Sequence, residues 1–194
     1  FKEFSELAYE SHWLSLDTYT QARQARFVRN NSLGPKGFSL DIYVDNLNAV
    51  SVVTVYTPDH TGLFSKLAGA FALSGANVVD AKANTTKTGM ALDTFWIQNT
   101  ERLPFDGEED IARLRSNVGE AIVDGGWLSK SLAIKSMNPQ DRSYVFSVRP
   151  RVLIDNEASR LHTVIEVNAR DRIGLLYDLT LVFASLELQI SSSH

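Results

Sequence analysis

The chain has 194 residues, 44% of them hydrophobic, which is enough for one domain or two small ones with apolar cores. It has no cysteine, which excludes a disulfide framework, a thiolate metal site and a cysteine nucleophile. A net charge of −4 with mixed signs, and no apolar run of about 20 residues, predict a cytoplasmic chain that binds neither nucleic acid nor membrane.

The first part of the chain is predicted to be a helical lead-in followed by a strand. Phe1 to Asn31 is polar and helix-like, and LGPKG, Leu33 to Gly37, is typical of a boundary with a sheet domain, so residues 1–36 are expected to be a helical lead-in and linker. GFSLDIYV, Gly37 to Val44, alternates in the way a strand does, and Asp45 to Asn48 predicts a turn.

The middle of the chain predicts the order β-α-β-β-α-β. The first helix carries Leu63, Leu67 and Phe71 at helical spacing. The other elements are expected at Val52 to Tyr56, Ser74 to Val79, Gly89 to Asn99, Glu108 to Gly126 (helix) and Tyr144 to Ile154, with Pro150 tolerated on an edge strand. This order predicts an α+β fold of the ferredoxin-like kind over residues 37–155, an antiparallel sheet with two helices on one face.

The end of the chain repeats the start of that unit. A shift of 112 positions places Val167 on Val55, Asp171 on Asp59 and Gly174 on Gly62 without a gap. Residues 160–194 therefore predict a second, incomplete copy that has only a strand, a helix and a strand. The strand expected between these two strands is missing, so we expect the chain to be a piece of a longer protein.

The repeated turn D-x-x-G-L is the main candidate for chemistry. A glycine that opens a helix lets a ligand approach the free backbone N–H groups, which suit a carboxylate. Asp59 or Asp171 could accept from an ammonium, and Asn77 at the next strand could add an amide contact. For a single such motif an ordinary turn with an N-cap is the favoured explanation, but two copies at the same place favour binding of an α-amino acid.

Motifs for catalysis are missing from the sequence. There is no G-x-S-x-G, no P-loop and no G-x-G, so a catalytic site wholly inside this chain is not expected. Arg23, Arg26 and Arg29 lie near one face of the lead-in helix, where a solvated face is favoured over a phosphate site. No histidine has a partner at metal-ligand spacing.

The split βαβ repeat with D-x-x-G-L at its first turn resembles the ACT domain, a regulatory module that typically binds amino acids. Within that family, Val53 to Asn99, Pro150 to Thr180 and the lead-in WLSLDTYTQARQARFVR resemble the tandem C-terminal ACT region of the bifunctional PII uridylyltransferase/uridylyl-removing enzymes. Many members have proline before the turn glycine, where this chain has Thr61 and Ile173.

This resemblance implies a regulatory region whose parent carries a nucleotidyltransferase domain, a hydrolase domain and Mg²⁺. The expected partners are glutamine or another amino acid, the parent's catalytic domains, the PII protein and a paired ACT domain. The implied ligand-binding residues are Asp59, His60, Thr61, Gly62, Leu63, Asn77, Asp171, Arg172, Ile173, Gly174 and Leu175.

Two other functions stay open at this point. The ACT pair could dock on the catalytic domains or on PII without any ligand, as a structural module. It could also be the sensor of another metabolic enzyme, such as a guanosine-tetraphosphate synthetase, a reading that depends on likeness of fold alone.

Overall fold

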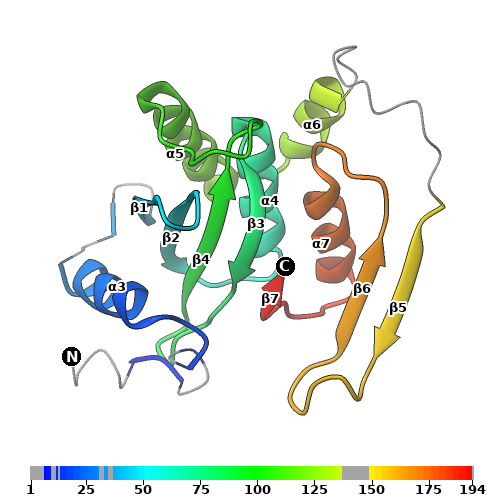
Figure 1. Ribbon diagram of the computed structural model, residues 1–194, viewed down its shortest axis with the longest axis horizontal. Coiled ribbons are helices and arrows are strands. Elements are labelled where there is room, and N and C mark those ends of the chain that lie inside the picture. Colours follow the sequence, from blue (N-terminus) through cyan, green and yellow to red (C-terminus); the bar gives the residue numbers. More distant parts are fainter. Residues whose placement is uncertain are drawn as a thin grey trace.

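The computed structural model describes residues 7–9, 12, 14–30, 33–34, 37–136 and 149–193, and these form a mixed α+β structure (Figure 1). The larger sheet is antiparallel, with strand order β1-β2-β4-β3-β7. Its strands are β1 Ser39–Asp45, β2 Val50–Pro58, β3 Asn77–Lys82, β4 Met90–Gln98 and β7 Ser192–Ser193. The predicted α+β class, with an antiparallel sheet of the ferredoxin-like kind, is confirmed.

Strands β1 and β2 form a hairpin because the turn between them is locally determined. The Asp45 carboxylate accepts hydrogen bonds from the backbone N–H groups of Leu47 and Asn48, at 3.0 and 3.3 Å. In the resulting register Leu40 lies opposite Val55, and both side chains are buried on the inner face of the sheet. The alternation seen in the sequence therefore sets which face of β1 is apolar.

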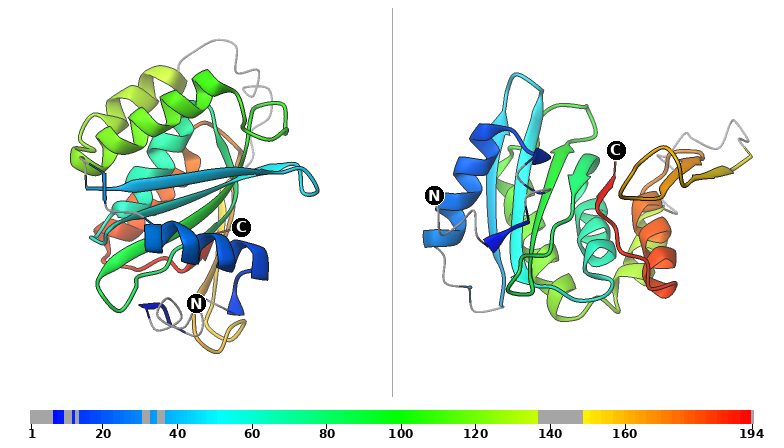
Figure 2. Two further views of the ribbon diagram at one scale, coloured as in Figure 1. Left: turned by 90° about the vertical axis from the view of Figure 1, so that its left-hand side faces the viewer. Right: turned by 90° about the horizontal axis from the view of Figure 1, so that it is seen from below.

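Two helices cover the inner face of the sheet, as predicted (Figure 2). They are α4, Leu63–Ser74, and α5, Glu108–Val123, and their apolar faces meet the strands in one core. The Phe71 ring of α4 lies edge-on to Phe95 of β4, with ring centroids 4.6 Å apart. A further helix that the sequence analysis did not predict, α6 at Leu128–Ser136, packs against α4 through Leu128 and Leu132.

The lead-in helix α3, Thr18–Asn30, covers the outer face of the same sheet through polar contacts. The Gln24 amide nitrogen donates to the Thr94 hydroxyl of β4 at 2.6 Å, and Gln24 Oε1 lies 2.9 Å from His12 Nε2. Arg23 forms an ion pair with Asp41 of β1 at 2.5 Å. Arg23 is thus a structural side chain of this contact.

No helix in the described ranges is both long and apolar enough to cross a membrane.

The predicted fourth strand at Tyr144 to Ile154 needs correction. Residues 144–148 lie outside the described part of the chain, and Arg151–Asp155 form strand β5, which pairs with β6 at Val164–Asn168. The edge position beside β2, which the prediction gave to this fourth strand, is occupied by β1, the strand that precedes β2 in the chain. A short turn brings consecutive strands together at little entropic cost, so each hairpin forms from neighbouring segments.

The second copy packs beside the first through a helix and a strand. Its helix α7, Leu175–Ser185, lies against α4, and its strand β7 pairs with β3 so that Ser193 is opposite Ala81 (Figure 1). The β5 and β6 hairpin forms a separate sheet. Val152 of β5 is 56% exposed, whereas Leu40, at the equivalent place in the first copy, is 8% exposed.

Candidate functional site

Both predicted turn glycines lie directly before a helix. Gly62 precedes α4 with φ 82°, and Gly174 precedes α7 with φ 79°. This left-handed backbone is readily adopted by glycine, which explains why both turns carry one. The helices begin without a side-chain cap, so their first-turn N–H groups form a region of positive potential in each bend.

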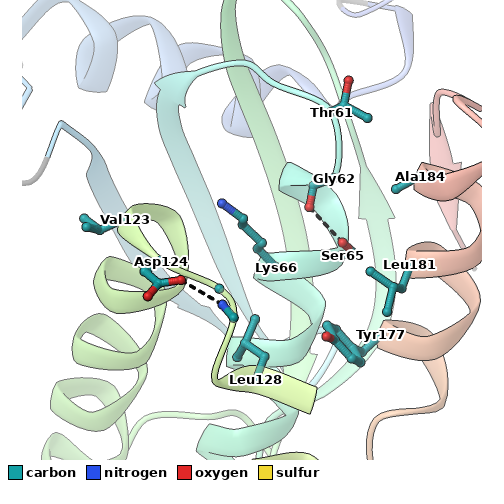
Figure 3. Close-up of a pocket in the computed structure, with 12 residues that line it drawn as sticks. Thr61, Gly62, Ser65, Lys66, Val123, Asp124, Leu128, Tyr177, Leu181 and Ala184 are labelled. Carbon is teal, nitrogen blue, oxygen red and sulfur yellow. Dashed lines mark hydrogen bonds between the residues drawn. The ribbon is translucent and has the colours of Figure 1, made fainter. Parts of the chain in front are cut away.

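The first bend, Asp59 to Leu63, opens on a cavity of about 420 Å³ (Figure 3). Three groups of residues surround it: the start of α4, the end of α5 with the loop to α6, and one side of α7. The lining residues are Thr61, Gly62, Ser65, Lys66, Val123, Asp124, Gly125, Gly126, Leu128, Tyr177, Leu181 and Ala184. Because α7 belongs to the second copy, both copies contribute walls.

The walls of the cavity carry groups of both charges. The start of α4 and Lys66 supply positive potential, while Asp124 follows the carboxyl end of α5. The Lys66 ammonium donates to the Ile122 carbonyl at 3.4 Å, and the Asp124 carboxylate accepts from the Gly126 N–H at 2.9 Å. In Figure 3 the Lys66 side chain extends toward the end of α5. Such an arrangement is complementary to a small zwitterion.

The second bend, Asp171 to Leu175, differs from the first in access and in charge. Gly174 is buried, and a Leu132 methyl carbon of α6 lies 3.4 Å from the place that a Cβ on this glycine would take. Where α4 has Lys66, α7 has Asp178, which pairs with Arg172 at 2.5 Å. This carboxylate already supplies a negative charge near the start of α7, so the second bend is poorly suited to another anion.

Of the predicted residues in the first bend, only Thr61 and Gly62 line the cavity. The Asp59 carboxylate accepts a hydrogen bond from the Thr85 hydroxyl, and the exposed His60 ring has its Nδ1 3.0 Å from the Thr61 carbonyl oxygen. Leu63 is 2% exposed and belongs to the core. Asp59 therefore braces the bend instead of facing the cavity.

The structure does not bring Asn77 to the first bend. Asn77 lies opposite Gln98 at one end of β4, whereas Pro58, next to the bend, lies opposite Met90 at the other end. At about 3.4 Å per residue these ends are roughly 27 Å apart. In the second bend, Asp171 and Arg172 are exposed, and Ile173 and Leu175 are half-buried.

Sequence reasoning missed Lys66, Asp124 and Tyr177 as cavity residues. Lys66 lies one helical turn after Gly62, so helix geometry could have placed it near the bend. The other two come from α5's end and from the second copy. The packing of α5 and of α7 against α4 brings them to the bend.

Relatives of known name match nearly the whole chain. It is 44% identical to the "Bifunctional uridylyltransferase/uridylyl-removing enzyme" of Gluconobacter oxydans (strain 621H), over 98% of this chain and 20% of that protein. The proteins of the same name from Azospirillum brasilense and Rhodospirillum rubrum are 43% and 41% identical, over 100% and 99% of this chain and 21% and 20% of their own lengths.

No family model matches the chain, and no solved structure matches it. The chain spans about a fifth of the length of the curated relatives that it matches. Along nearly its whole length, this chain is a homologue of one segment of the bifunctional uridylyltransferase/uridylyl-removing enzymes.

Proposed function

We propose that this chain is a tandem ACT region that senses an amino acid and regulates a PII uridylyltransferase/uridylyl-removing enzyme. The cavity at the first bend is the receptor site. The observation that carries this proposal is the cavity's two charged walls: the start of α4, which has no side-chain cap, and the carboxyl end of α5 with Asp124, where the Lys66 ammonium also reaches the Ile122 carbonyl. An α-amino acid carries the two matching charges on adjacent groups.

The ligand carboxylate would bind the first-turn N–H groups of α4, with Lys66 as a charged neighbour. A helix start carries roughly half a positive elementary charge, and a helix end roughly half a negative one. The ammonium would therefore lie toward the Asp124 carboxylate. Leu128, Tyr177 and Leu181 provide an apolar surface for the stem of the ligand side chain.

Occupancy of the cavity would hold the two copies together. Tyr177, Leu181 and Ala184 come from α7, while Gly62 and Lys66 come from α4, so a bound amino acid contacts both helices. A ligand that prefers the docked state shifts the equilibrium toward it, and a coupling free energy of about 1–3 kcal/mol is sufficient for a useful switch.

The relatives support the choice of parent enzyme, and the resemblance to ACT regions supports the choice of glutamine. Their printed name joins uridylyl transfer with uridylyl removal, and this chain covers only about a fifth of their length. Catalysis would then belong to the remaining parts. High glutamine would favour removal of UMP from PII, and low glutamine would favour its addition. Glutamine is accordingly the first ligand to test.

Calorimetric titration of the 194-residue chain with L-glutamine tests the site. Lys66→Met should weaken binding at least several-fold, whereas Lys130→Met, which changes an exposed lysine of α6, should leave it unchanged. L-glutaminamide lacks the free carboxylate and glutaramic acid lacks the ammonium, so both should bind more weakly. Absence of heat with L-glutamine, or equal binding by the Lys66 variant, would contradict the proposal.

One observation favours a docking role as a second candidate. Val152 and Ile154 of β5 are 56% and 66% exposed, on the face whose equivalents in the first copy form the core. Apolar surface of this kind marks contacts with other parts of a protein. If the chain binds PII or the parent's catalytic parts while no amino acid changes its melting temperature, this candidate replaces sensing.

A further inference from the structure

Asp93 is an acidic residue buried on the inner face of the central strand β4. It is 4% exposed, and its side chain lies on the same face as Phe95, opposite Val55 of β2. The pKa of the Asp93 carboxyl is raised to about 7, mainly by burial; a hydrogen bond from the Asn84 N–H opposes the rise, and the nearby Asp59 carboxylate adds to it. Ionisation of the Asp93 carboxyl group is therefore less favourable than that of an ordinary aspartate.

No cation faces Asp93 within the described ranges. On β3, Lys82 lies opposite Thr94 and Asp80 lies opposite Trp96, so both belong to the outer face. On that face Tyr56 of β2 lies opposite Leu92, and Arg23 of α3 pairs with Asp41.

The Lys66 ammonium reaches the Ile122 carbonyl, and the His60 ring is exposed beside its own turn. Asp59 is the charged neighbour that acts on Asp93.

A short series of hydrogen bonds links Asp93 to the first bend. The Asn84 N–H donates to the Asp93 carboxyl at 3.0 Å, and the next residue, Thr85, donates its hydroxyl to Asp59. The Asp59 N–H donates to the Gly89 carbonyl at 3.0 Å. Since Asp59 begins the first bend, a change at Asp93 reaches the cavity through the backbone of Asn84 and Thr85 and then the side chains of Thr85 and Asp59.

The side-chain amide of Asn84 completes this arrangement. Its nitrogen is buried and has no acceptor among the residues that the structure describes. A buried donor without an acceptor is unfavourable, and it forms a hydrogen bond readily with a nearby charged oxygen. The segment Asn84–Thr85 therefore has two ways to satisfy its polar groups, according to the charge on Asp93.

We propose that Asp93 is a proton-controlled brace of the first bend, which makes the receptor site sensitive to pH. While Asp93 holds its proton, Thr85 and Asp59 stay bonded and the bend keeps the described geometry. When the proton leaves for solvent, the Asp93 and Asp59 carboxylates repel each other and Asn84 turns toward the new charge. The Thr85 bond then weakens and the bend shifts. The regulatory meaning of this brace rests on the proposed function, whereas the brace itself requires no ligand.

A ligand-free NMR titration of the 194-residue chain between about pH 5 and pH 9 tests the brace. The Asp93 carboxyl carbon and the Gly62 amide should titrate together, with a midpoint near 7. Asp93→Asn should remove the Gly62 transition, and Asp59→Asn should lower the Asp93 midpoint by about half a unit or more because one negative charge is gone. Asp106→Asn, in an exposed loop, is the control and should change neither.

An Asp93 midpoint near 4, or a Gly62 amide that ignores the Asp93 transition, would overturn the proposal. If Asp93→Asn does not fold, the Asp59→Asn shift decides the question alone. A parallel titration with L-glutamine should show weaker binding at pH 8 than at pH 6. Absence of binding at both values, together with a Gly62 transition near 7, would reject sensing and leave the brace standing. Binding without any Gly62 transition would reject the brace and leave sensing standing.

Discussion

The ring of Tyr177 lies directly against the backbone of Gly69. A ring carbon is 2.8 Å from the place that a Cβ on Gly69 would occupy, closer than real Cβ contacts allow. Tyr177 comes from α7 of the second copy and Gly69 from α4 of the first, and the Tyr177 hydroxyl lies 2.7 Å from the Ser129 hydroxyl of α6. The absence of a side chain at one helical position thus permits the close contact between the copies.

Gly69→Ala should destabilise the chain, although glycine to alanine inside a helix usually stabilises by about 1 kcal/mol. The added methyl group meets a rigid ring, and overpacking of this kind typically costs about 1–3 kcal/mol. Urea unfolding of the wild type and the variant gives the difference. In a Tyr177→Ala background the same substitution should become neutral or stabilising. A loss of equal size in both backgrounds would show that the ring is not the cause.

Lys135→Met should lower the melting temperature, because the Lys135 ammonium caps the carboxyl end of α4. It donates to the Ala72 and Leu73 carbonyls at 2.9 and 2.8 Å. Partial burial and the neighbouring Arg113 lower the Lys135 pKa, yet these charged hydrogen bonds should contribute about 1–3 kcal/mol. Thermal unfolding measures the loss, with Lys130→Met as the exposed control on the same helix. Equal melting of both variants would argue against the cap.

Stability should fall in mild acid because of His12. Burial lowers the His12 pKa below 6.5, although the hydrogen bond to Gln24 opposes this. The unfolded chain then binds the proton more readily, so the contribution is complete above 6.5 and disappears as pH falls through the lower folded value. Urea unfolding at about pH 5 and pH 7.5 should show this loss in the wild type and less of it in His12→Gln. An identical pH dependence in both would contradict the assignment.

The chain should bind one amino acid, not two. Gly62→Ala and Gly174→Ala each place a side chain at a left-handed backbone position, so each should cost about 1–2 kcal/mol of stability. Only Gly62→Ala should also alter the calorimetric affinity for L-glutamine, because the second bend is covered by Leu132 and already has Asp178 beside it. A stoichiometry of two, or weaker binding by Gly174→Ala, would show that both bends bind ligand.

Local patterns in the sequence predicted most elements of the first copy. Leu63, Leu67 and Phe71 at helical spacing predicted α4, and the apolar alternation from Phe38 to Val44 predicted β1. The place of β1 in the sheet was not predictable from alternation alone. A strand pattern defines which face is apolar, but hydrogen bonding to β2 is decided by the turn at Asp45 and by competition for the same edge.

The bends were predictable as local geometry, but the cavity was not. The two D-x-x-G-L motifs predicted Gly62 and Gly174 as turn residues, because glycine is the residue that most readily adopts a left-handed backbone before a helix. The difference between the bends arises from packing: Leu132 of α6 covers one of them, and Tyr177 of α7 forms a wall of the other. Contacts between elements far apart in the chain leave no periodic signal in a single sequence.

The pairing of β7 with β3 joins segments roughly a hundred residues apart in the chain. Contacts of such separation form late in folding, because the intervening loop must first be closed against its entropy. Most of the buried apolar cluster is formed by residues of the first copy, to which α7 adds Tyr177. We therefore expect refolding to proceed in two kinetic phases, a fast one for the first copy and a slower one in which β7 and α7 join it.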